Sequence, residues 1–560
     1  MIDRLKLKAR RLWRRSRRDL SDAWATLRQN GPGEVQFWII ALIVGIAAGT
    51  AALAFREAII WLQATIYGES DFRLASFASE LPWFRVLIIP IIGGLVVGLI
   101  LWKFTPDGRI RSLAHVIEGA AMRNGRVEKR AGLASALASL ITLSTGGSTG
   151  REGPVVHIGA VISSWVSNKI RADGVTARDL MGCAAAAAVS ASFNAPIAGA
   201  IFAMEVVLRH FAMHAFAPIV IASVSGTVIS RLYSGNVPEF TLPSHTLAFY
   251  VELPAFLILG IICGLVAVVM MRTIFVAERL GDRMQAATRM PTWARPAVAG
   301  AMLGLIAIFF PHIIGVGYET TNMALSGDLL FWNAVVFAIV KVIAVAITMA
   351  GRMGGGIFSP SLMMGALTGI AFGWVATAIF PTVSGAHTLY ALAGMGALAA
   401  AVLGAPISTI LIVFEMTGDW QAGIAVMASV SLATAFSSRL VDRSFFLTQL
   451  EQRDIHLAAG PQEYLLATIH VGAVMRPRGV ENGASDTQSW ELVDQGVTLA
   501  PGDTLETAMP LFQKLGMDFI PVTRPGAEGE APDLIGALFL VDALRSYNRA
   551  LAECAAEEHS

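Results

Sequence analysis

Charged residues are scarce in this chain. Of its 560 residues, 15% are charged and 55% are hydrophobic, and the mean hydropathy is +0.61. A soluble globular protein carries about a quarter charged residues, so this composition excludes an ordinary soluble protein. It predicts instead that most of the chain faces lipid or the interior of a helix bundle.

Cysteines and enzyme signatures are also few. Cys183, Cys263 and Cys554 are too few and too scattered for a disulfide framework or a metal site, and we expect them to be packing residues. No H-E-x-x-H, P-loop or G-x-S-x-G motif occurs in a suitable setting. The glycine-rich "GGSTGREG" lacks the lysine and the preceding strand of a phosphate-binding loop. The sequence therefore predicts no enzymatic activity and no cofactor or metal.

Positive charge is concentrated at the N-terminus. Ten Lys or Arg residues but only three acids lie between Met1 and Arg28. No apolar segment follows directly, so this is not a secretory signal. A basic segment ahead of a membrane span favours contact with anionic lipid over nucleic-acid binding. We therefore expect residues 1–33 to lie in the cytoplasm, the protein to reside in a bacterial inner membrane, and no nucleic acid to be a partner.

Apolar stretches recur from Phe37 to about Phe446. Several are shorter than the roughly 20 residues that a helix needs to cross a bilayer core of about 30 Å. Many are interrupted by Gly, Pro, Ser or Asn, and unwound backbone at membrane depth is tolerated only where it is buried in protein or lines a cavity. The pattern predicts tilted, broken helices around an internal site. The stretches are 37–63, 85–103, 132–143, 178–192, 196–208, 216–231, 249–276, 293–311, 330–350, 361–380, 388–403, 405–417 and 421–437.

Two pairs of motifs recur in the same order along this region. Each G-x-x-x-P is followed five residues later by Gly-Ala, and each later proline lies nine residues before a glutamate. Such matched pairs predict a membrane domain over residues 34–446, made of two related halves at about 34–235 and 245–446 with a site between them. The paired residues are Gly150 and Pro154 with Gly356 and Pro360, then Pro196 and Glu205 with Pro406 and Glu415.

The matched helix starts, "GREGP" and "GGGIFSP", favour anion binding. Glycines before a proline leave free backbone N–H groups and the positive end of the helix dipole at the break. Together they would select anions without a full positive charge that traps them, although each could also be a simple helix kink. Regularly spaced arginines and rings of acids are lacking, which argues against a voltage sensor or a cation channel.

Glu152 lies inside the first of these starts. An ionised carboxylate there competes with an anion for the same donors, and a protonated one can swing away. The pattern predicts that Glu152 is a gate and a proton acceptor, and the alternative is a structural partner of Arg151. The other isolated acids in apolar stretches, Glu118, Glu205 and Glu415, are expected mostly to make packing or polar contacts.

The chain becomes polar after Phe446, with a linker at 447–469 and a small α/β unit at 470–560. The latter reads as a strand, a helix at "TLETAMPLFQKLG", strands at "FIPVTR" and "LIGALFL", and a final helix. This pattern resembles one cystathionine-β-synthase-type (CBS) domain, with "VGAVMRP" as the remnant of a first copy. Because such modules usually pair, a single copy leaves nucleotide binding open.

The membrane motifs resemble those of the chloride channel (CLC) family of anion channels and anion/proton antiporters. "GREGP" and "GIFSP" match two family motifs, and "FNAPIAGAIFAMEV" and "GAPISTILIVFEMTGD" match two interface helices. The resemblance covers roughly residues 35–450. It implies inverted repeats, a homodimer with one independent pore per subunit, and cytoplasmic N- and C-termini.

The resemblance also implies a site. Glu152 matches the gating glutamate, and the Ile357 and Phe358 amides match those that hold the central anion. The side chain of Arg151 is expected to be mainly structural. The implied anion-binding residues are Gly150, Arg151, Gly153, Gly356, Ile357, Phe358 and Phe446, with Ser112 or Arg111.

Three departures from the family pattern bear on mechanism. The serine of the family's G-S-G-I-P motif falls at Ser112 or, with one residue of slip, at Arg111; the first keeps a hydroxyl, whereas the second would place a fixed cation near the inner mouth. Phe446 replaces the inner-gate tyrosine, so the phenol hydroxyl is absent. Val206 replaces the proton-transfer glutamate of antiporters, and valine cannot carry a proton.

The sequence thus predicts an all-α polytopic membrane protein with a small C-terminal α/β domain, which passes chloride or a similar small anion. Val206 and Phe446 favour a channel or a weakly coupled conductor, and a chloride/proton antiporter that uses another proton route is the alternative. A cation-coupled symporter is disfavoured because the helix breaks are rich in donors and lack cation ligands.

Overall fold

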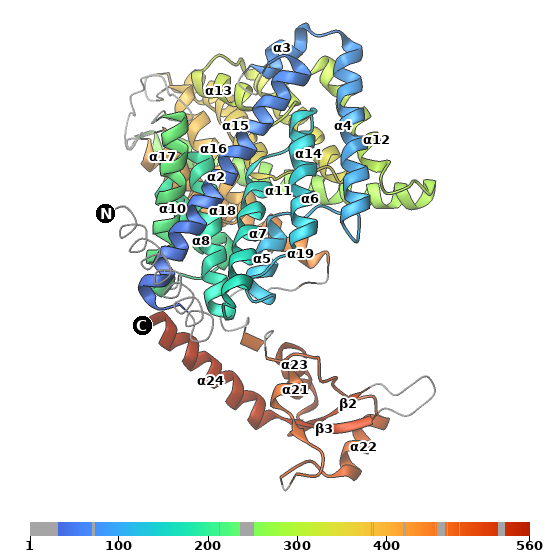
Figure 1. The fold of residues 1–560 in the computed structure, drawn as a ribbon. Helices are drawn as coiled ribbons and strands as arrows, with labels where there is room; N and C mark the ends of the chain where they lie inside the picture. Colours follow the sequence, from blue (N-terminus) through green and yellow to red (C-terminus); the bar gives the residue numbers. More distant parts are fainter. Residues whose placement is uncertain are drawn as a thin grey trace, which may run out of the picture. The chain divides into compact units, whose positions relative to one another are not determined.

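The computed structural model describes residues 32–69, 73–211, 213–235, 251–381, 384, 386–417, 422–453, 455, 465–466, 469–480, 482–524 and 533–559. The basic segment that we expect in the cytoplasm therefore lies almost wholly outside the described residues. The chain is mainly helical (Figure 1) and divides into two compact units. The membrane unit contains Met1–Leu208 and Ala215–Gln449, and the C-terminal unit contains Arg209–His214 and Leu450–Ser560.

The membrane unit is built from helices alone in its described part, and several of them are short, as the broken apolar stretches predict. Its first half contains α2 (Glu34–Tyr67), α3 (Leu74–Glu80), α4 (Trp83–Phe104), α5 (Leu113–Met122), α6 (Lys129–Ser144), α7 (Glu152–Ile170), α8 (Gly174–Phe193), α9 (Pro196–Phe202), the π-helix η1 (Ala203–Leu208) and α10 (Met213–Ser234). Its second half contains α11 (Leu253–Thr288), α12 (Arg295–Phe309), the 3-10 helix η3 (Pro311–Ile313), α13 (Tyr318–Ser326), α14 (Phe331–Ala350), α15 (Phe358–Ile379), α16 (His387–Leu403), α17 (Pro406–Thr417), α18 (Gly423–Leu440) and α19 (Phe445–Glu451).

Seven helical stretches in the described ranges are long and apolar enough to cross a membrane. Their outward faces carry large apolar side chains, which suits lipid contact. The protein is therefore a multi-pass integral membrane protein. The stretches are Glu34–Tyr67, Trp83–Phe104, Met213–Ser234, Leu253–Thr288, Phe331–Ala350, Phe358–Ile379 and Gly423–Glu451.

Two helices, α8 and α16, lie inside the membrane unit. Every residue from Asp179 to Phe193, and every one from Thr388 to Leu403, is buried. Both helices are rich in alanine, and small residues let neighbouring helix backbones approach closely. At Gly369 of α15, for example, an added Cβ would lie 2.1 Å from the Tyr390 carbonyl oxygen of α16. These helices need not span the bilayer, because protein surrounds them.

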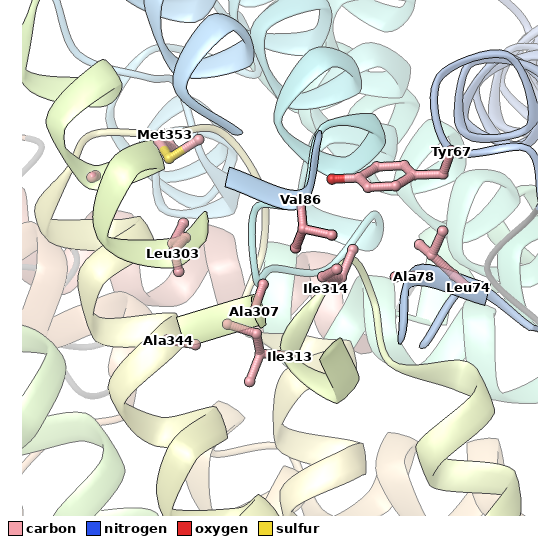
Figure 2. Packing of buried hydrophobic residues seen from close by; sticks show 11 residues of the cluster. Tyr67, Leu74, Ala78, Val86, Leu303, Ala307, Ile313, Ile314, Ala344 and Met353 are labelled. Carbon is pink, nitrogen blue, oxygen red and sulfur yellow. The ribbon is translucent and has the colours of Figure 1, made fainter. Parts of the chain in front are cut away.

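An apolar cluster supports the chain segment that leads into α7. Tyr67, Leu74 and Val86 pack with Leu303 and other residues of α12 and η3 (Figure 2). The segment before α7 contacts this cluster at Gly146, which has a φ of +101° and whose added Cβ would lie 2.8 Å from the Tyr67 hydroxyl. The cluster thus helps to fix the approach to "GREGP".

The C-terminal unit contains a three-stranded antiparallel sheet in the order β1-β3-β2. The predicted helix and the two long strands are present, with Ile520 opposite Leu538 in the β2–β3 pair. An apolar core that includes Leu505, Phe512 and Val522 joins the helices to the sheet. The elements are α21 (Val471–Val474), β1 (Arg476–Pro477), α22 (Asp486–Asp494), α23 (Leu505–Leu515), β2 (Phe519–Arg524), β3 (Asp533–Phe539) and α24 (Leu540–His559).

Two details of this unit differ from the sequence-based expectation. "VGAVMRP" is not a detached remnant, because its Arg476 pairs with Ala537 and makes β1 an edge strand of the same sheet. The strand expected before α23 is reduced to a single parallel bridge between Leu499 and Val522. Helix α22 was not expected, because its sequence is polar and lacks a clear apolar period.

Candidate functional site

The two matched motifs meet in the fold. The backbone N–H groups of Gly150 and Gly356 each donate to the other's carbonyl oxygen, at 2.7 Å, and form an isolated antiparallel bridge. The Thr149 hydroxyl adds a 2.8 Å hydrogen bond to the Gly356 oxygen. Helix α7 begins at Glu152, just after one partner, and α15 begins at Phe358, just after the other. The bridge thus holds two helix starts side by side.

This close approach requires glycine. An added Cβ at Gly356 would lie 3.0 Å from the Gly153 nitrogen, and one at Gly150 would lie 2.7 Å from a Glu152 carboxylate oxygen. Gly355 has a φ of +137°, which side-chain-bearing residues rarely adopt. A larger residue at these positions would separate the two helix starts.

Glu152 joins the two helix starts through its side chain. Its carboxylate is 4% exposed, and Oε1 accepts a hydrogen bond from the hydroxyl of Ser359, the second residue of α15. Its other oxygen, Oε2, has no hydrogen-bond partner in the described part of the chain. The first amides of a helix have no partners within the helix and carry partial positive charge. Glu152 therefore places a negative group where α15 favours an anion.

Arg151 is held by the scaffold around Glu152. Its side chain is buried, Nη2 donates to the Ser192 carbonyl oxygen at 3.2 Å, and the guanidinium lies 4.9 Å from the centre of the Tyr318 ring. Its Nε lies 4.0 Å from the Glu152 carboxylate. These contacts fit the structural role expected for this side chain, which also supplies positive charge beside Glu152.

A small cavity lies at these helix starts. Of the described residues that line it, Glu152 alone is ionisable, and the others are glycines or carry apolar side chains. Gly153, Gly356, Ile357, Phe358 and Phe446, all expected from the sequence, belong to the lining, whereas Gly150, Arg151, Arg111 and Ser112 do not. Sequence reasoning missed Leu113, Val156, Val189, Phe193, Phe202 and Leu403. Of these, Val156 could have been found, because it lies one helical turn after Glu152.

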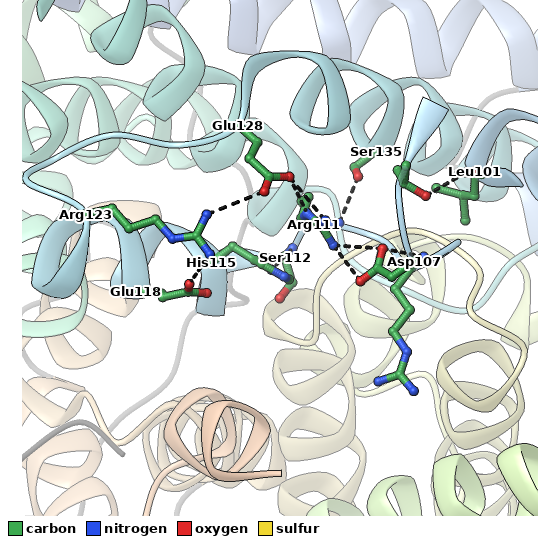
Figure 3. Close-up of polar contacts among 11 residues, drawn as sticks. Leu101, Asp107, Arg111, Ser112, His115, Glu118, Arg123, Glu128 and Ser135 are labelled. Carbon is green, nitrogen blue, oxygen red and sulfur yellow. Dashed lines mark hydrogen bonds and ion pairs between the residues drawn. The ribbon is translucent and has the colours of Figure 1, made fainter. Parts of the chain in front are cut away.

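Ser112 and Arg111, the two residues of the alternative registers, have different surroundings (Figure 3). The Arg111 guanidinium donates to both Asp107 oxygens, at 3.1 and 3.0 Å, and to Glu128 at 3.1 Å. Burial alone would raise the pKa of Asp107, but its hydrogen bonds with Arg111 and that residue's charge outweigh burial and lower the pKa. Two carboxylates therefore neutralise Arg111, which disfavours the register that would make it a fixed cation near the inner mouth.

Ser112 lies at the edge of the cavity instead. It precedes α5, and the next residue, Leu113, lines the cavity. Its backbone N–H donates to His115 Nδ1 at 3.0 Å, and its hydroxyl donates to Gln449 Oε1 of α19 at 2.9 Å. This placement favours the register that keeps a hydroxyl near the cavity.

Val206 lies outside the cavity lining, and so do the isolated glutamates Glu118, Glu205 and Glu415. Val206 is buried in η1, and a π-helical turn inside an α-helix often marks a functional region. Glu205 accepts the backbone N–H groups of Ile407 and Ser408 at the start of α17, at 3.0 and 2.7 Å. In the other half, Glu415 accepts those of Ile197 and Ala198 at the start of α9, at 3.1 and 2.7 Å.

The expected polar-contact roles of these glutamates are therefore confirmed. Glu118, the third of them, forms an ion pair with Arg123 at 2.6 Å. In the described residues, no group of three or more His, Cys, Asp or Glu side chains could hold a metal ion. The chemistry that the site offers is hydrogen bonding to an anion, next to one carboxylate that can take up a proton.

Comparisons with known proteins identify the family and the fold of the chain. The profile of the voltage-gated chloride channel family matches residues 93–438. A ClcB-like chloride channel protein of Ralstonia nicotianae is 32% identical over 398 residues, which are 69% of this chain and 90% of the relative.

Two solved structures share the fold. A slow cyanobacterial Cl−/H+ antiporter has a TM-score of 0.66 at 22% identity and covers 75% of this chain and 98% of its own. A eukaryotic CLC transporter has a TM-score of 0.66 at 18% identity and covers 93% of this chain and 98% of its own. The predicted fold, helical with a small C-terminal α/β unit, is confirmed. Because the family profile also matches more than half of the sequence, the chain belongs to the voltage-gated chloride channel (CLC) family.

Proposed function

We propose that this protein passes chloride, or a similar small anion, across the membrane through the cavity at Glu152, as a channel or a weakly coupled conductor. The observation that carries the proposal is the Glu152 carboxylate, which accepts the Ser359 hydroxyl at the start of α15. A helix start that binds one anionic group can bind another in its place. Chloride is the anion named for the Ralstonia relative and the cyanobacterial structure, which supports this choice.

Glu152 acts as the gate in this proposal. While ionised, its carboxylate occupies the donors at the helix starts and blocks the cavity. Protonation removes the charge, so the side chain no longer competes with the anion and can move away. The Ile357 and Phe358 amides then hold the anion, and Gly150, Gly153 and Gly356 keep the two helix starts close.

Weak coupling to protons is proposed from two side chains. Val206 cannot carry a proton, and Phe446 offers no hydroxyl at the cavity wall. The alternative, a chloride/proton antiporter with another proton route, is supported by the name of the cyanobacterial structure. The two are distinguished in liposomes by imposing a chloride gradient and recording proton flux. Stoichiometric proton movement would refute uncoupled conduction.

The gate is tested by chloride efflux from liposomes that contain the purified protein. Glu152→Gln should raise efflux and remove its dependence on pH, because the side chain can no longer ionise. Glu80→Gln is the matched control, since Glu80 is exposed at the end of α3. A Glu152→Gln protein that keeps the wild-type pH profile would refute the assignment.

The assembly is proposed from the family resemblance. Two copies would form a homodimer with one pore each, through α9 and α17, where Ile197 and Ile407 are 56% and 49% exposed in the single chain. We place the protein in a bacterial inner membrane with both termini in the cytoplasm, as the basic residues before Arg28 favour. The C-terminal unit would act as a CBS-like module that stiffens the dimer, and titration with ATP tests whether it also binds a nucleotide.

A further inference from the structure

A polar contact near the cavity joins the first half of the membrane unit to its C-terminal end. The Ser112 hydroxyl donates to Gln449 Oε1 at 2.9 Å, although the two residues are 337 positions apart. Ser112 precedes Leu113 at the start of α5, and Gln449 lies three residues after Phe446 on α19. Both Leu113 and Phe446 line the cavity. Residues three apart lie on the same side of a helix, so Gln449 follows the lining residue Phe446 on one side of α19, although Gln449 is not itself part of the lining.

Among the described residues that line the cavity, no side chain at this edge offers another hydrogen-bond donor. Leu113, Leu403 and Phe446 are apolar, and the acidic Glu152 is the ionisable side chain in the described part of the lining. An anion that loses water here requires replacement donors, because an uncompensated charge away from water is very costly. The hydroxyl of Ser112 has one proton, which it already donates to Gln449. The Gln449 carboxamide, in contrast, has two N–H groups on Nε2.

We propose that Gln449 is a specificity-determining residue of the anion path. Its Nε2 amide donates to the anion at the edge of the cavity, and Ser112 orients the carboxamide by holding Oε1. Gln449 is half-buried, so it can contact both the cavity and the water outside it. A neutral amide donor binds a small monovalent anion without the strong attraction of a fixed cation. This inference rests on the proposed function and adds one side-chain donor that binds the anion.

The chemistry of the site predicts distinct effects for different substitutions. Gln449→Leu removes both N–H groups and should weaken chloride binding about tenfold, the effect of losing one hydrogen bond to a charged group. Gln449→Glu has nearly the same shape and still accepts from Ser112, but it replaces the donors by a negative charge. It should weaken binding more than Gln449→Leu does. Adding Phe446→Tyr to Gln449→Leu supplies a new hydroxyl at the wall and should recover part of the affinity.

The experiment measures chloride affinity by calorimetry in detergent and chloride efflux from liposomes, with the full-length protein. Thr448→Val is the matched control, because the Thr448 hydroxyl donates to the Arg443 carbonyl oxygen near its own helix. Wild-type affinity in both Gln449→Leu and Gln449→Glu would overturn the proposal. Faster efflux at unchanged chloride affinity would also overturn the proposal, because it would mean that the Ser112–Gln449 contact obstructs the anion path and does not bind the anion.

The outcomes also separate this inference from the proposed function. A wild-type protein that gives no chloride efflux would refute the function itself. Efflux that responds to Glu152→Gln but not to either Gln449 variant would leave the function intact and refute the role of Gln449. Should Gln449→Leu fail to fold, Gln449→Glu remains a sufficient test, because it keeps the size of the side chain and the contact with Ser112.

Discussion

Removing Glu205 or Glu415 should loosen the attachment between the two halves of the membrane unit. Each carboxylate accepts two backbone N–H groups at the start of a helix in the other half. Glu205 follows α9 and holds the start of α17, while Glu415 lies on α17 and holds the start of α9. The two contacts are therefore reciprocal.

The expected cost follows from the number and type of bonds lost. A hydrogen bond to a charged group contributes about 1.5–3 kcal/mol, and both carboxylates are half-buried, which favours the lower end. Glu415→Ala loses two such bonds and should reduce the free energy of unfolding by about 3 kcal/mol. Glu415→Gln keeps one acceptor and should lose about half as much. Glu205→Ala and Glu205→Gln should behave in the same way.

Because the contacts are reciprocal, the decreases in the free energy of unfolding caused by removing Glu205 and Glu415 should not be additive. Once one carboxylate is removed, the second helix is already loosened, so the double alanine variant should lose less than the sum of the single variants, by about 0.5–3 kcal/mol. Unfolding of the purified protein in mixed micelles, followed by tryptophan fluorescence, measures these values. Glu80→Ala serves as the exposed control. Strict additivity, or a loss below about 0.5 kcal/mol in each single variant, would contradict the reciprocal arrangement.

Three further outcomes are expected. Gly355→Ala should destabilise the protein by about 1–3 kcal/mol because its φ is +137°, whereas Gly502→Ala, with no atom near its added Cβ, should not; unfolding in micelles compares them. Arg111 lowers the pKa of Asp107, so the ionised carboxylate stabilises the fold fully above the usual carboxyl pKa of 3.8 and loses this effect as pH falls through the lowered pKa. Asp107→Asn should remove this stabilisation, so the free energies of unfolding of variant and wild type, measured against pH, should converge in acid. Phe512→Ala leaves a cavity in the core of the C-terminal unit and should lower the free energy of unfolding of that unit by about 3–5 kcal/mol, measured by its sensitivity to protease.

The contact between the two helix starts could be predicted from the sequence because the motifs are repeated. Gly150 and Gly356 occupy matched places in the two halves, and matched helix breaks in such folds point to one site. Glu152 followed from its position inside one of those breaks. These inferences depend on glycine, proline and charge, which leave clear marks in an apolar sequence.

The apolar part of the cavity could not be predicted in the same way. Val189, Phe193 and Leu403 lie near the ends of α8 and α16, which are buried on all sides. A helix without an exposed face has no amphipathic period, so nothing in its sequence separates a residue that lines a cavity from one that packs against protein.

The sequence alone could not decide between Arg111 and Ser112, for a different reason. Both lie in an irregular segment, where a one-residue slip leaves no trace in a pattern. The decisive partners of Arg111, Asp107 and Glu128, are exposed acids like many others in the sequence. In the C-terminal unit, likewise, the edge strand at Arg476 is only two residues long and is recognisable only by its pairing with Ala537.

The bridge between Gly150 and Gly356 also limits how this protein can change during evolution. Its hydrogen bonds come from the main chain, which every residue except proline retains. A point substitution can crowd such a site, but it cannot exchange one donor for another, as it could in a site made of side chains. In the function proposed above, changes in anion preference would therefore arise from side chains in or beside the cavity, such as Ser112, Phe446 and Gln449, which can be replaced without altering the main chain.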